Sequence, residues 1–420
     1  MAEPVLANAA SLRAAVLARL PLLIEMTQAL VRADSQTPPS DTGATADIVA
    51  GYLAKCPQIE IQRLVSEQPV VNLVARLSGG LPGPRLILNG HLDTYPIGDH
   101  ANWSDDPLSG AVRDGRLYGR GSADMKGGVA ALMLVMMMFA EHLRPFPGEL
   151  VLALAGDEES MGELGTQHLI DTVPLVRGDA VLVADVGSPN VLRCGEKGMI
   201  WLDLDARGRS AHGAHVHRGD NAILSLMAAI AAIRELEHLP VAIPDAVRRT
   251  MAAAEDVSEP LGGAGERATM ERVTVNVGQI GGGVSANLVP EQAWAKLDIR
   301  LPMGTSVALV EGEIGRRLAA HPNVSATITR RYEPTWTEPS HPIAKACLAA
   351  AAEVVRADVR INMRVGASDA RLWRRAGIPT IVCGLTPHNL GAADEHLEIA
   401  ELPRLAAIHA LAAAKFLGCS

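Results

Sequence analysis

Three short apolar segments of this 420-residue chain are each followed at once by a histidine or by carboxylates. The segments are 85–89, 150–155 and 180–184, and glycine or proline lies close to both ends of each. Short apolar runs bounded in this way predict buried β-strands. Ligands of α/β sheets gather beyond the ends of strands. The pattern therefore predicts a polar ligand site built from the ends of several buried strands.

Strand and helix signals alternate before residue 198 and again after Pro334. Apolar residues at helical spacing predict helices, and short apolar runs predict strands between them. This alternation predicts a parallel or mixed sheet that is covered on both faces. Besides the three strands above, the predicted elements are helices at 11–33, 44–55, 126–143 and 343–356, strands at 71–77 and 379–383, and a terminal helix.

The intervening segment has a different pattern, strand-helix-strand-strand-helix-strand, which is ferredoxin-like. Its predicted elements are 199–206, 221–238, 271–277, 293–300, 307–320 and 325–330, and 243–265 is expected to be a long surface loop. The sequence therefore predicts an α/β protein of two domains. A mixed-sheet domain comprises 1–197 and 331–420, and a ferredoxin-like α+β domain, 198–330, is inserted into it.

Composition argues against several other classes of protein. The chain has 38 Lys and Arg against 47 Asp and Glu, a formal net charge of −9, which does not suit nucleic acid or an anionic membrane as partner. The longest apolar run, 129–140, is shorter than a membrane-spanning helix. Five scattered cysteines without a CxxC pair, and an N-terminus without a secretory signal, favour the cytoplasm.

The polar residues after the strands have the types that bind a metal ion. His91 and Asp93 are two apart in extended chain, so their side chains point the same way, and a carboxylate can fix the tautomer of a metal-binding imidazole. Asp124 follows a glycine-rich stretch without the spacing of a phosphate-binding loop, and is either a helix N-cap or a metal-bridging carboxylate. Glu158 and Glu159 repel each other, so they need a cation or raised pKa values to coexist.

Each motif alone also fits a solvated polar loop. Together they combine histidine with carboxylates, which suits Zn²⁺ or Mn²⁺.

Six segments, taken jointly, resemble the metallopeptidase family that contains aminoacylase, acetylornithine deacetylase, succinyl-diaminopimelate desuccinylase and glutamate carboxypeptidase. They are LILNGHLDTYP, WSDDPLSGAVRDGRLYGRGSADMKGG, LALAGDEE, GRSAHGAHVHRGDNAI, VGQIGGGVSANLVPEQAWAKLDIR and GASDARLW, and the resemblance covers nearly the whole chain. It implies that the first domain is a metal-binding catalytic domain. It also implies that the inserted domain is a lid through which two copies form a homodimer.

The resemblance assigns roles in the first domain position by position. His91 resembles a ligand of one metal, and Asp93 the carboxylate that supports it. Asp124 is similar to the carboxylate that bridges two metals. Glu158 matches the general base, and Glu159 a ligand of the second metal.

Further roles follow from the same resemblance. Asp185 matches the other ligand of the first metal. In the inserted domain, His212 resembles a histidine that reaches the active site of the partner subunit. Asn287 and Arg300 match substrate-holding positions, and a guanidinium is suited to pair with a substrate carboxylate.

The last motif departs from the family pattern. A metal-binding histidine usually stands four residues before the glutamate that Glu395 matches, but this chain has Gly391 there. His388 and His396 are the nearest substitutes, and His388 is the expected ligand because the position after the matched glutamate is not a ligand in the family. The first site is therefore expected to be complete, and one or two ions per subunit are both compatible with the sequence.

The expected activity is metal-dependent hydrolysis of a C–N bond, most simply the amide of a small carboxylate-bearing substrate. Hydrolytic release of ammonia from an unusual amine, for example an aromatic one, is an alternative that the altered last motif leaves open. A catalytically silent binding protein of the same fold is a second alternative. A nicotinamide oxidoreductase is disfavoured because the chain lacks GxGxxG.

Overall fold

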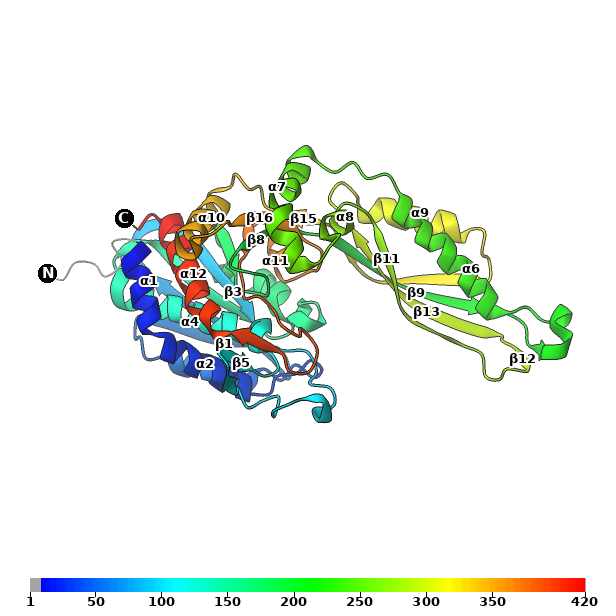
Figure 1. Ribbon diagram of the computed structural model, residues 1–420, viewed down its shortest axis with the longest axis horizontal. Coiled ribbons are helices and arrows are strands. Elements are labelled where there is room, and N and C mark those ends of the chain that lie inside the picture. The colour runs from blue at the N-terminus through cyan, green and yellow to red at the C-terminus, as the bar shows by residue number, and fades with distance from the viewer. Residues whose placement is uncertain (1–8, 420) are drawn as a thin grey trace. The chain divides into compact units, whose positions relative to one another are not determined.

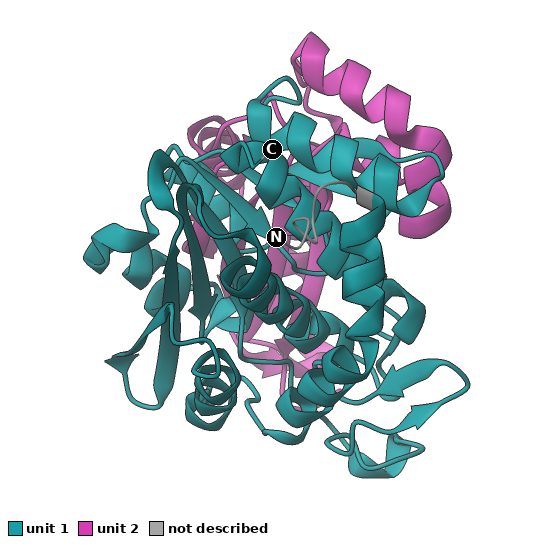
Figure 2. Cartoon of the chain, turned by 90° about the vertical axis from the view of Figure 1, so that its left-hand side faces the viewer, with its two compact units in different colours: residues 1–194, 336–362, 368–420 teal, residues 195–335, 363–367 magenta. Residues whose placement is uncertain are grey.

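The chain divides into two compact units in the computed structural model, which describes residues 9–419 (Figure 2). Unit 1 comprises 1–194, 336–362 and 368–420, and unit 2 comprises 195–335 and 363–367. Three short segments that were predicted in the first domain, 195–197, 331–335 and 363–367, thus belong to unit 2. The N-terminal residues on which the predicted location partly rests lie outside the described range.

The sheet of unit 1 is mixed and has the strand order β1-β2-β6-β3-β7-β17-β8-β15, with β16 paired to β8. Its strands are β1 (Ile59–Glu67), β2 (Val70–Ser78), β3 (Gly80–His91), β6 (Phe146–Ala155), β7 (Ala180–Val183), β8 (Val191–Glu196), β15 (Thr335–Trp336), β16 (Arg360–Arg364) and β17 (Thr380–Val382). A second, three-stranded sheet has the order β18-β5-β4 and consists of β4 (Val112–Arg113), β5 (Arg116–Tyr118) and β18 (His396–Glu398).

Four neighbouring strands of the large sheet, β6, β3, β7 and β17, run parallel to one another. Near their carboxyl ends the strands are level with one another, because His91 pairs with Ala155 and Asn89 pairs with Val183. The carboxyl ends of these strands therefore lie at one edge of the sheet. The polar residues that follow each strand in the sequence are brought together there, although they are far apart along the chain.

Apolar helices cover this sheet, and α12 packs against both α4 and α10 (Figure 1). Every residue of α4 is buried, as expected for a helix that is apolar on all sides. The stretch Ser122–Leu143 has the length and composition of a membrane span, but its most apolar window lies wholly inside the protein, which is typical of a core helix. The helices of unit 1 are α1 (Ala9–Ala18), α2 (Leu20–Arg32), α3 (Gly43–Leu53), α4 (Gly127–Met138), α5 (His168–Thr172), α10 (Pro342–Val355), α11 (Ala370–Arg375) and α12 (Leu402–Leu417).

The single helix predicted over 11–33 is wrong, because the chain bends by 55° between α1 and α2. Pro21 lies in the first turn of α2. Proline has no main-chain N–H and cannot continue the hydrogen-bond ladder of a preceding helix, whereas it is well tolerated at a helix start.

Unit 2 is a four-stranded antiparallel sheet of order β11-β13-β9-β14, with a separate two-stranded sheet, β10-β12. Two helices, α6 and α9, follow the first and third strands, so the predicted ferredoxin-like order is confirmed. Its strands are β9 (Gly198–Arg207), β10 (Ala211–His212), β11 (Thr274–Gly282), β12 (Leu288–Val289), β13 (Gln292–Leu301) and β14 (Val324–Tyr332), and its helices are α6 (Ala222–Arg234), α7 (Asp245–Gly262), α8 (Glu266–Met270) and α9 (Val307–Leu318).

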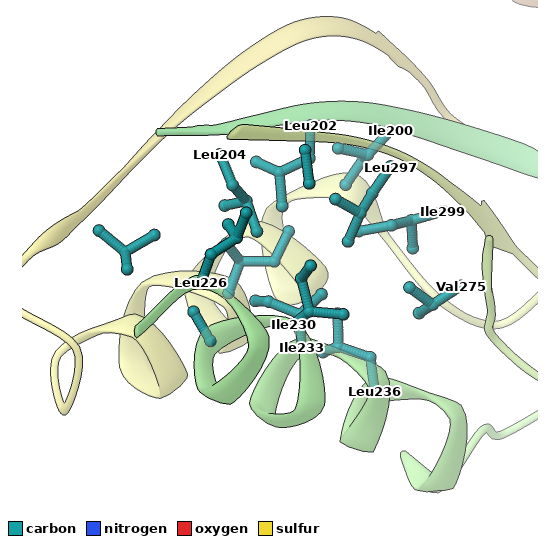
Figure 3. Close-up of a cluster of buried hydrophobic side chains, with 14 of the residues drawn as sticks. Ile200, Leu202, Leu204, Leu226, Ile230, Ile233, Leu236, Val275, Leu297 and Ile299 are labelled. Atoms are coloured by element: carbon teal, nitrogen blue, oxygen red, sulfur yellow. The ribbon is translucent and has the colours of Figure 1, made fainter. Parts of the chain in front are cut away.

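The core of unit 2 lies between α6 and one face of its sheet (Figure 3). Leu226 and Ile233 of α6 point towards Leu202 and Leu297 of the central strands, and all four are at most 2% exposed. Buried and exposed residues alternate along β13, so its exposed side chains lie on the face of the sheet opposite this core.

The surface loop predicted over 243–265 is wrong, because this segment forms α7. Val247, Met251, Ala254 and Ser258 are its buried residues, at the three- and four-residue spacing of a helix face. Small and polar residues occupy half of that face, so the apolar pattern of the segment is weak.

We expect Leu226→Ala to lower the free energy of unfolding by about 2–5 kcal/mol, because it removes buried methyl groups and leaves a cavity. Leu309 lies in α9 of the same unit, and 52% of it is exposed. Leu309→Ala should change stability by no more than about 0.5 kcal/mol. Denaturant unfolding of the two variants measures the difference, and equal losses would contradict the placement of α6.

Candidate metal centre

Three residues from separate chain segments meet beyond the parallel strand ends of unit 1. His91 is the last residue of β3, Asp124 lies in the segment before α4, and Glu159 lies in the turn after β6. One ligand atom of each lies within 4.8 Å of the others. His91 and Asp124 are buried, and Glu159 is half-buried. The sequence predicted all three as metal ligands, and the structure brings them together.

The hydrogen bonds of His91 fix which ring nitrogen faces this group. Its Nδ1 lies 3.0 Å from the main-chain oxygen of Asp93, and because a carbonyl only accepts, Nδ1 must be the donor. Nε2 lies 3.0 Å from Oδ1 of Asp124. An unprotonated Nε2 and a carboxylate oxygen are both acceptors, so this contact requires either a proton or a cation between the two groups.

Asp93 holds the turn that carries the two glutamates. Its carboxylate accepts hydrogen bonds from the main-chain N–H groups of Glu158 and Glu159, both at 3.1 Å, and from Thr37 Oγ1 at 2.8 Å. The nearest carboxylate oxygen lies 3.5 Å from His91 Nδ1, farther than the main-chain oxygen. The carboxylate of Asp93 therefore positions Glu158 and Glu159, and it also helps to raise the pKa of His91. Its role as the support of a metal-binding His91 stays a prediction.

Electrostatics in this pocket disfavour several negative charges at once. Burial, together with the charges of Asp124 and Glu158, raises the pKa of Glu159. Burial also raises the pKa of Glu158; His91 opposes this shift, and Asp369 and Asp185 add to it. For His91, burial lowers the pKa, but hydrogen bonds to Asp124 and Asp93 outweigh it, so the net shift is upward. A cation would remove this mutual repulsion.

A divalent cation fits the residues that are present. Oε1 of Glu159 is buried and accepts no hydrogen bond within the described part of the chain, so this atom is available to bind a cation or water. One imidazole nitrogen with carboxylate oxygens is a donor set typical of Zn²⁺ and also used by Mn²⁺. His91, Asp124 and Glu159 could hold such an ion.

Asp185 and His388 do not belong to the group of three. Asp185 follows β7, is 4% exposed, and accepts a hydrogen bond from the N–H of Val186 at 2.5 Å. It is close enough to Glu158 to raise the pKa of that residue. The ring of His388 stacks on the ring of His396 with centroids 4.8 Å apart. The ligand roles of Asp185 and His388 stay predictions.

The loop that contains Gly391 is held to the Asp124 segment through the main chain. The carboxylate of Glu395 accepts hydrogen bonds from the N–H groups of Ala123 and Asp124, at 3.2 and 3.3 Å. Glu395 also pairs with the buried Arg120 at 2.5 Å, and Arg120 donates to the carbonyls of Gly391 and its neighbour at 3.1 and 3.2 Å. No sequence pattern had assigned a role to Arg120 or to the carboxylate of Glu395.

The remaining predicted residues lie in unit 2. His212 is exposed, and its Nδ1 accepts a hydrogen bond from the N–H of Ala214 at 3.1 Å. The next residue, Gly213, donates to the main-chain oxygen of Asn287 at 2.6 Å, so His212 and Asn287 lie at the same end of the unit. Arg300 lies near the far end of β13 and contacts both carboxylate oxygens of Asp298, at 2.9 and 3.0 Å. Their roles towards a substrate stay predictions.

A buried group of one histidine and carboxylates lies at the strand ends of a mixed α/β sheet. Sites of this class are typical of metal-dependent hydrolases. The model of peptidase family M20/M25/M40 matches residues 87–415, and the chain belongs to this family. The protein is therefore an M20 metallohydrolase, of the peptidase and desuccinylase type, as the sequence predicted. The family implies a divalent metal, which agrees with the group of His91, Asp124 and Glu159.

Curated relatives match over most of their length. A succinyl-diaminopimelate desuccinylase of Methylobacterium sp. (strain 4-46) is 32% identical over 404 residues, covering 92% of this chain and 94% of the relative. A protein of the same name from Paracoccus denitrificans is 30% identical over 398 residues, covering 92% and 96%.

Solved structures confirm the α/β fold with a separate small antiparallel sheet. A di-peptidase from Saccharomyces cerevisiae has a TM-score of 0.78 at 14% identity, covering 98% of this chain and 99% of the other. Human carnosine dipeptidase 1 has a TM-score of 0.75 at 15% identity, covering 98% and 100%. At these identities the likeness shows the fold alone.

Removal of metal should destabilise the protein, because the carboxylates around His91 would lose their counter-charge. At a free Zn²⁺ concentration 100 times the dissociation constant, binding should add about 2.7 kcal/mol to the free energy of unfolding. His91→Ala should abolish this gain, whereas His100→Ala, at an exposed histidine of the same unit, should retain it. Thermal unfolding of chelator-treated protein with and without Zn²⁺ measures the effect. An equal gain in the two variants would rule out His91 as a ligand.

Proposed function

We propose that the protein hydrolyses the amide bond of a small carboxylate-bearing substrate, as a deacylase or carboxypeptidase, with Glu158 as general base. One observation carries this proposal. Glu158 lies in a half-buried turn beside Glu159, and Asp93 fixes the main chain of both residues next to the His91–Asp124 contact. A base and a cation-binding group are thereby held at the same strand end.

A divalent ion held by His91, Asp124 and Glu159, with Asp185 and His388 as further proposed ligands, would supply Lewis acidity that lowers the pKa of water towards neutral. Glu158 takes the proton from the attacking water and then donates it to the leaving nitrogen. Burial raises the pKa of Glu158, so this carboxylate takes up a proton more readily than an exposed one does.

The proposed substrate class follows from the relatives and from Arg300. The relatives named above are desuccinylases of a diamino acid, which supports an N-acyl amino acid as substrate. We propose that Arg300 binds a substrate carboxylate and that Asn287 and His212 hold the scissile carbonyl, with His212 stabilising the oxyanion. N-succinyl-diaminopimelate is the first substrate to test, followed by N-acetyl amino acids and dipeptides.

We further propose that the enzyme is a cytoplasmic homodimer in which His212 acts in the partner's active site. Exposed apolar side chains on unit 2 support an interface, because large exposed apolar residues often mark contact surfaces. Leu224 and Met227 of α6 are 62% and 55% exposed, and Ile280 of β11 is 56% exposed. The cytoplasmic location rests on the scattered cysteines of the sequence.

Release of ammonia from an amine is the second candidate, and Gly391 is the observation that favours it. A Cβ at this position would meet no atom within 4 Å, so open space stands where family members usually carry a ligand histidine. A changed second site could suit a different leaving group. Parallel assays of acyl release and of ammonia release separate the two candidates.

Glu158→Gln should retain bound metal and lower kcat by about 10²–10⁴-fold, because the amide cannot accept the proton from water. The exposed residue Glu67 supplies a matched control, and Glu67→Gln should leave kcat unchanged. Metal analysis and steady-state kinetics of both variants test the assignment. Full activity of Glu158→Gln would show that another group is the base.

Mixing two inactive variants tests the dimer. His212→Ala lacks the proposed oxyanion donor, and Glu158→Gln lacks the base, so each homodimer should be almost inactive. If His212 acts across the dimer, random heterodimers contain one intact site, and equal mixing should recover about a quarter of wild-type activity. Refolding the mixed variants and measuring turnover checks this value. No recovery, with heterodimers present, would place His212 in its own subunit's site, and full activity of the His212→Ala homodimer would place it outside any site.

A further inference from the structure

Arg371 is a buried arginine beside the proposed base, and the resemblance assigned it no role. It lies in α11, within the GASDARLW motif, and is 4% exposed. Its Nη1 lies 3.8 Å from Oε1 of Glu158. Arginine is rarely buried unless it is paired, so the contacts of Arg371 indicate what the side chain does.

Two strong hydrogen bonds fix the guanidinium. Nη1 donates to the main-chain oxygen of Ser368 at 2.6 Å, and Nη2 donates to that of Met161 at 2.7 Å. Ser368 precedes the helix that carries Arg371, so the first bond ties the side chain to its own segment. Met161 directly follows the turn Glu158–Ser160, so the second bond ties Arg371 to the turn with the base.

The planar guanidinium therefore contacts the turn at two places, its carboxylate and its end. Met161 has a φ of 87°, a left-handed conformation that an L-residue other than glycine seldom adopts. The bond from Arg371 and the bond from the N–H of Met161 to the oxygen of Glu158, at 2.8 Å, both hold this residue. Asp93 holds the same turn from the N–H groups of Glu158 and Glu159.

The charges around Glu158 indicate how Arg371 affects its carboxylate. Asp185 and Asp369 both lie close enough to Glu158 to repel its carboxylate. Arg371 attracts it across 3.8 Å, and opposite charges attract more strongly inside the protein than at the surface. Without Arg371, repulsion by Asp185 and Asp369 would favour another orientation of the Glu158 side chain.

We propose that Arg371 is a positioning residue that holds the carboxylate of Glu158, and the turn that carries it, in the orientation needed to take a proton from water. Arg371 touches neither substrate nor ion in this proposal and acts through Glu158. The inference rests on the proposed function for the role of Glu158, but the orientation of that side chain is a structural property that is measurable without turnover.

Arg374 supplies a matched control on the same helix. It is also buried, and it donates to the main-chain oxygens of Thr380, at 3.1 and 3.2 Å, and of Arg193, at 3.4 Å. These bonds tie α11 to neighbouring strands and do not involve the turn with Glu158. A general loss of packing around α11 would therefore follow from Arg374→Met as much as from Arg371→Met.

The experiment compares Arg371→Met, Arg371→Lys and Arg374→Met with the wild type, each loaded with Zn²⁺. Metal content, crystal structure, kcat and KM are measured for all four proteins. We expect Arg371→Met to bind metal normally, to show a rotated or displaced Glu158 carboxylate, and to lose about 10²-fold in kcat with KM changed by no more than about 3-fold.

Arg371→Lys retains the charge but not the fork of donors, so its kcat should lie between those of the wild type and Arg371→Met. If Arg371→Met fails to fold, this variant still decides the question through its structure and its kinetics. Arg374→Met should leave the Glu158 carboxylate and kcat unchanged, whatever it does to stability.

Three results would overturn the proposal. The first is an unmoved Glu158 carboxylate with unchanged kcat in Arg371→Met. The second is a rise in KM with unchanged kcat, which would show that Arg371 binds substrate. The third is an equal loss of kcat in Arg374→Met, which would show a merely structural role. If the wild type hydrolyses no amide, the proposed function fails, and the crystal structures still test the orientation of Glu158.

Discussion

The burial of several carboxylates around one histidine is the constraint on which the site depends. Asp124 and Glu159 lie beside His91, Glu158 is the neighbour of Glu159, and burial raises the pKa of both glutamates. Such a group costs free energy unless a positive charge compensates for it. These carboxylates all lie at one edge of the sheet. A divalent cation held between His91 and the carboxylates would supply the compensating charge.

The scaffold positions these side chains mainly through main-chain contacts. The parallel strands β3 and β6 end at the same level, because His91 pairs with Ala155 just before the acidic turn. The carboxylates of Asp93 and Glu395 then accept main-chain N–H groups of the segments that carry Glu159 and Asp124. A site built on strand ends and locked in this way is preorganised, and catalysis gains from groups that need no rearrangement.

Local patterns predicted the elements that bury an apolar face and missed those that do not. His91 ends one strongly apolar strand and Glu159 lies just after another, so local patterns were enough to single out both residues. The strand β1 has mostly exposed or half-buried residues and left no apolar run, and small residues weaken the pattern of α7. Contacts such as Arg371 with Met161 or Arg120 with Glu395 join residues 210 and 275 positions apart. No local spacing encodes such pairs, so only the folded chain shows them.

Anomalous X-ray diffraction at the zinc edge, from crystals grown with Zn²⁺, tests the central claim most directly. The account predicts an anomalous peak within about 2.0–2.2 Å of His91 Nε2 and of carboxylate oxygens from the surrounding acids. A second peak close by would add the second ion. A complete data set with no anomalous peak at His91 would contradict the account.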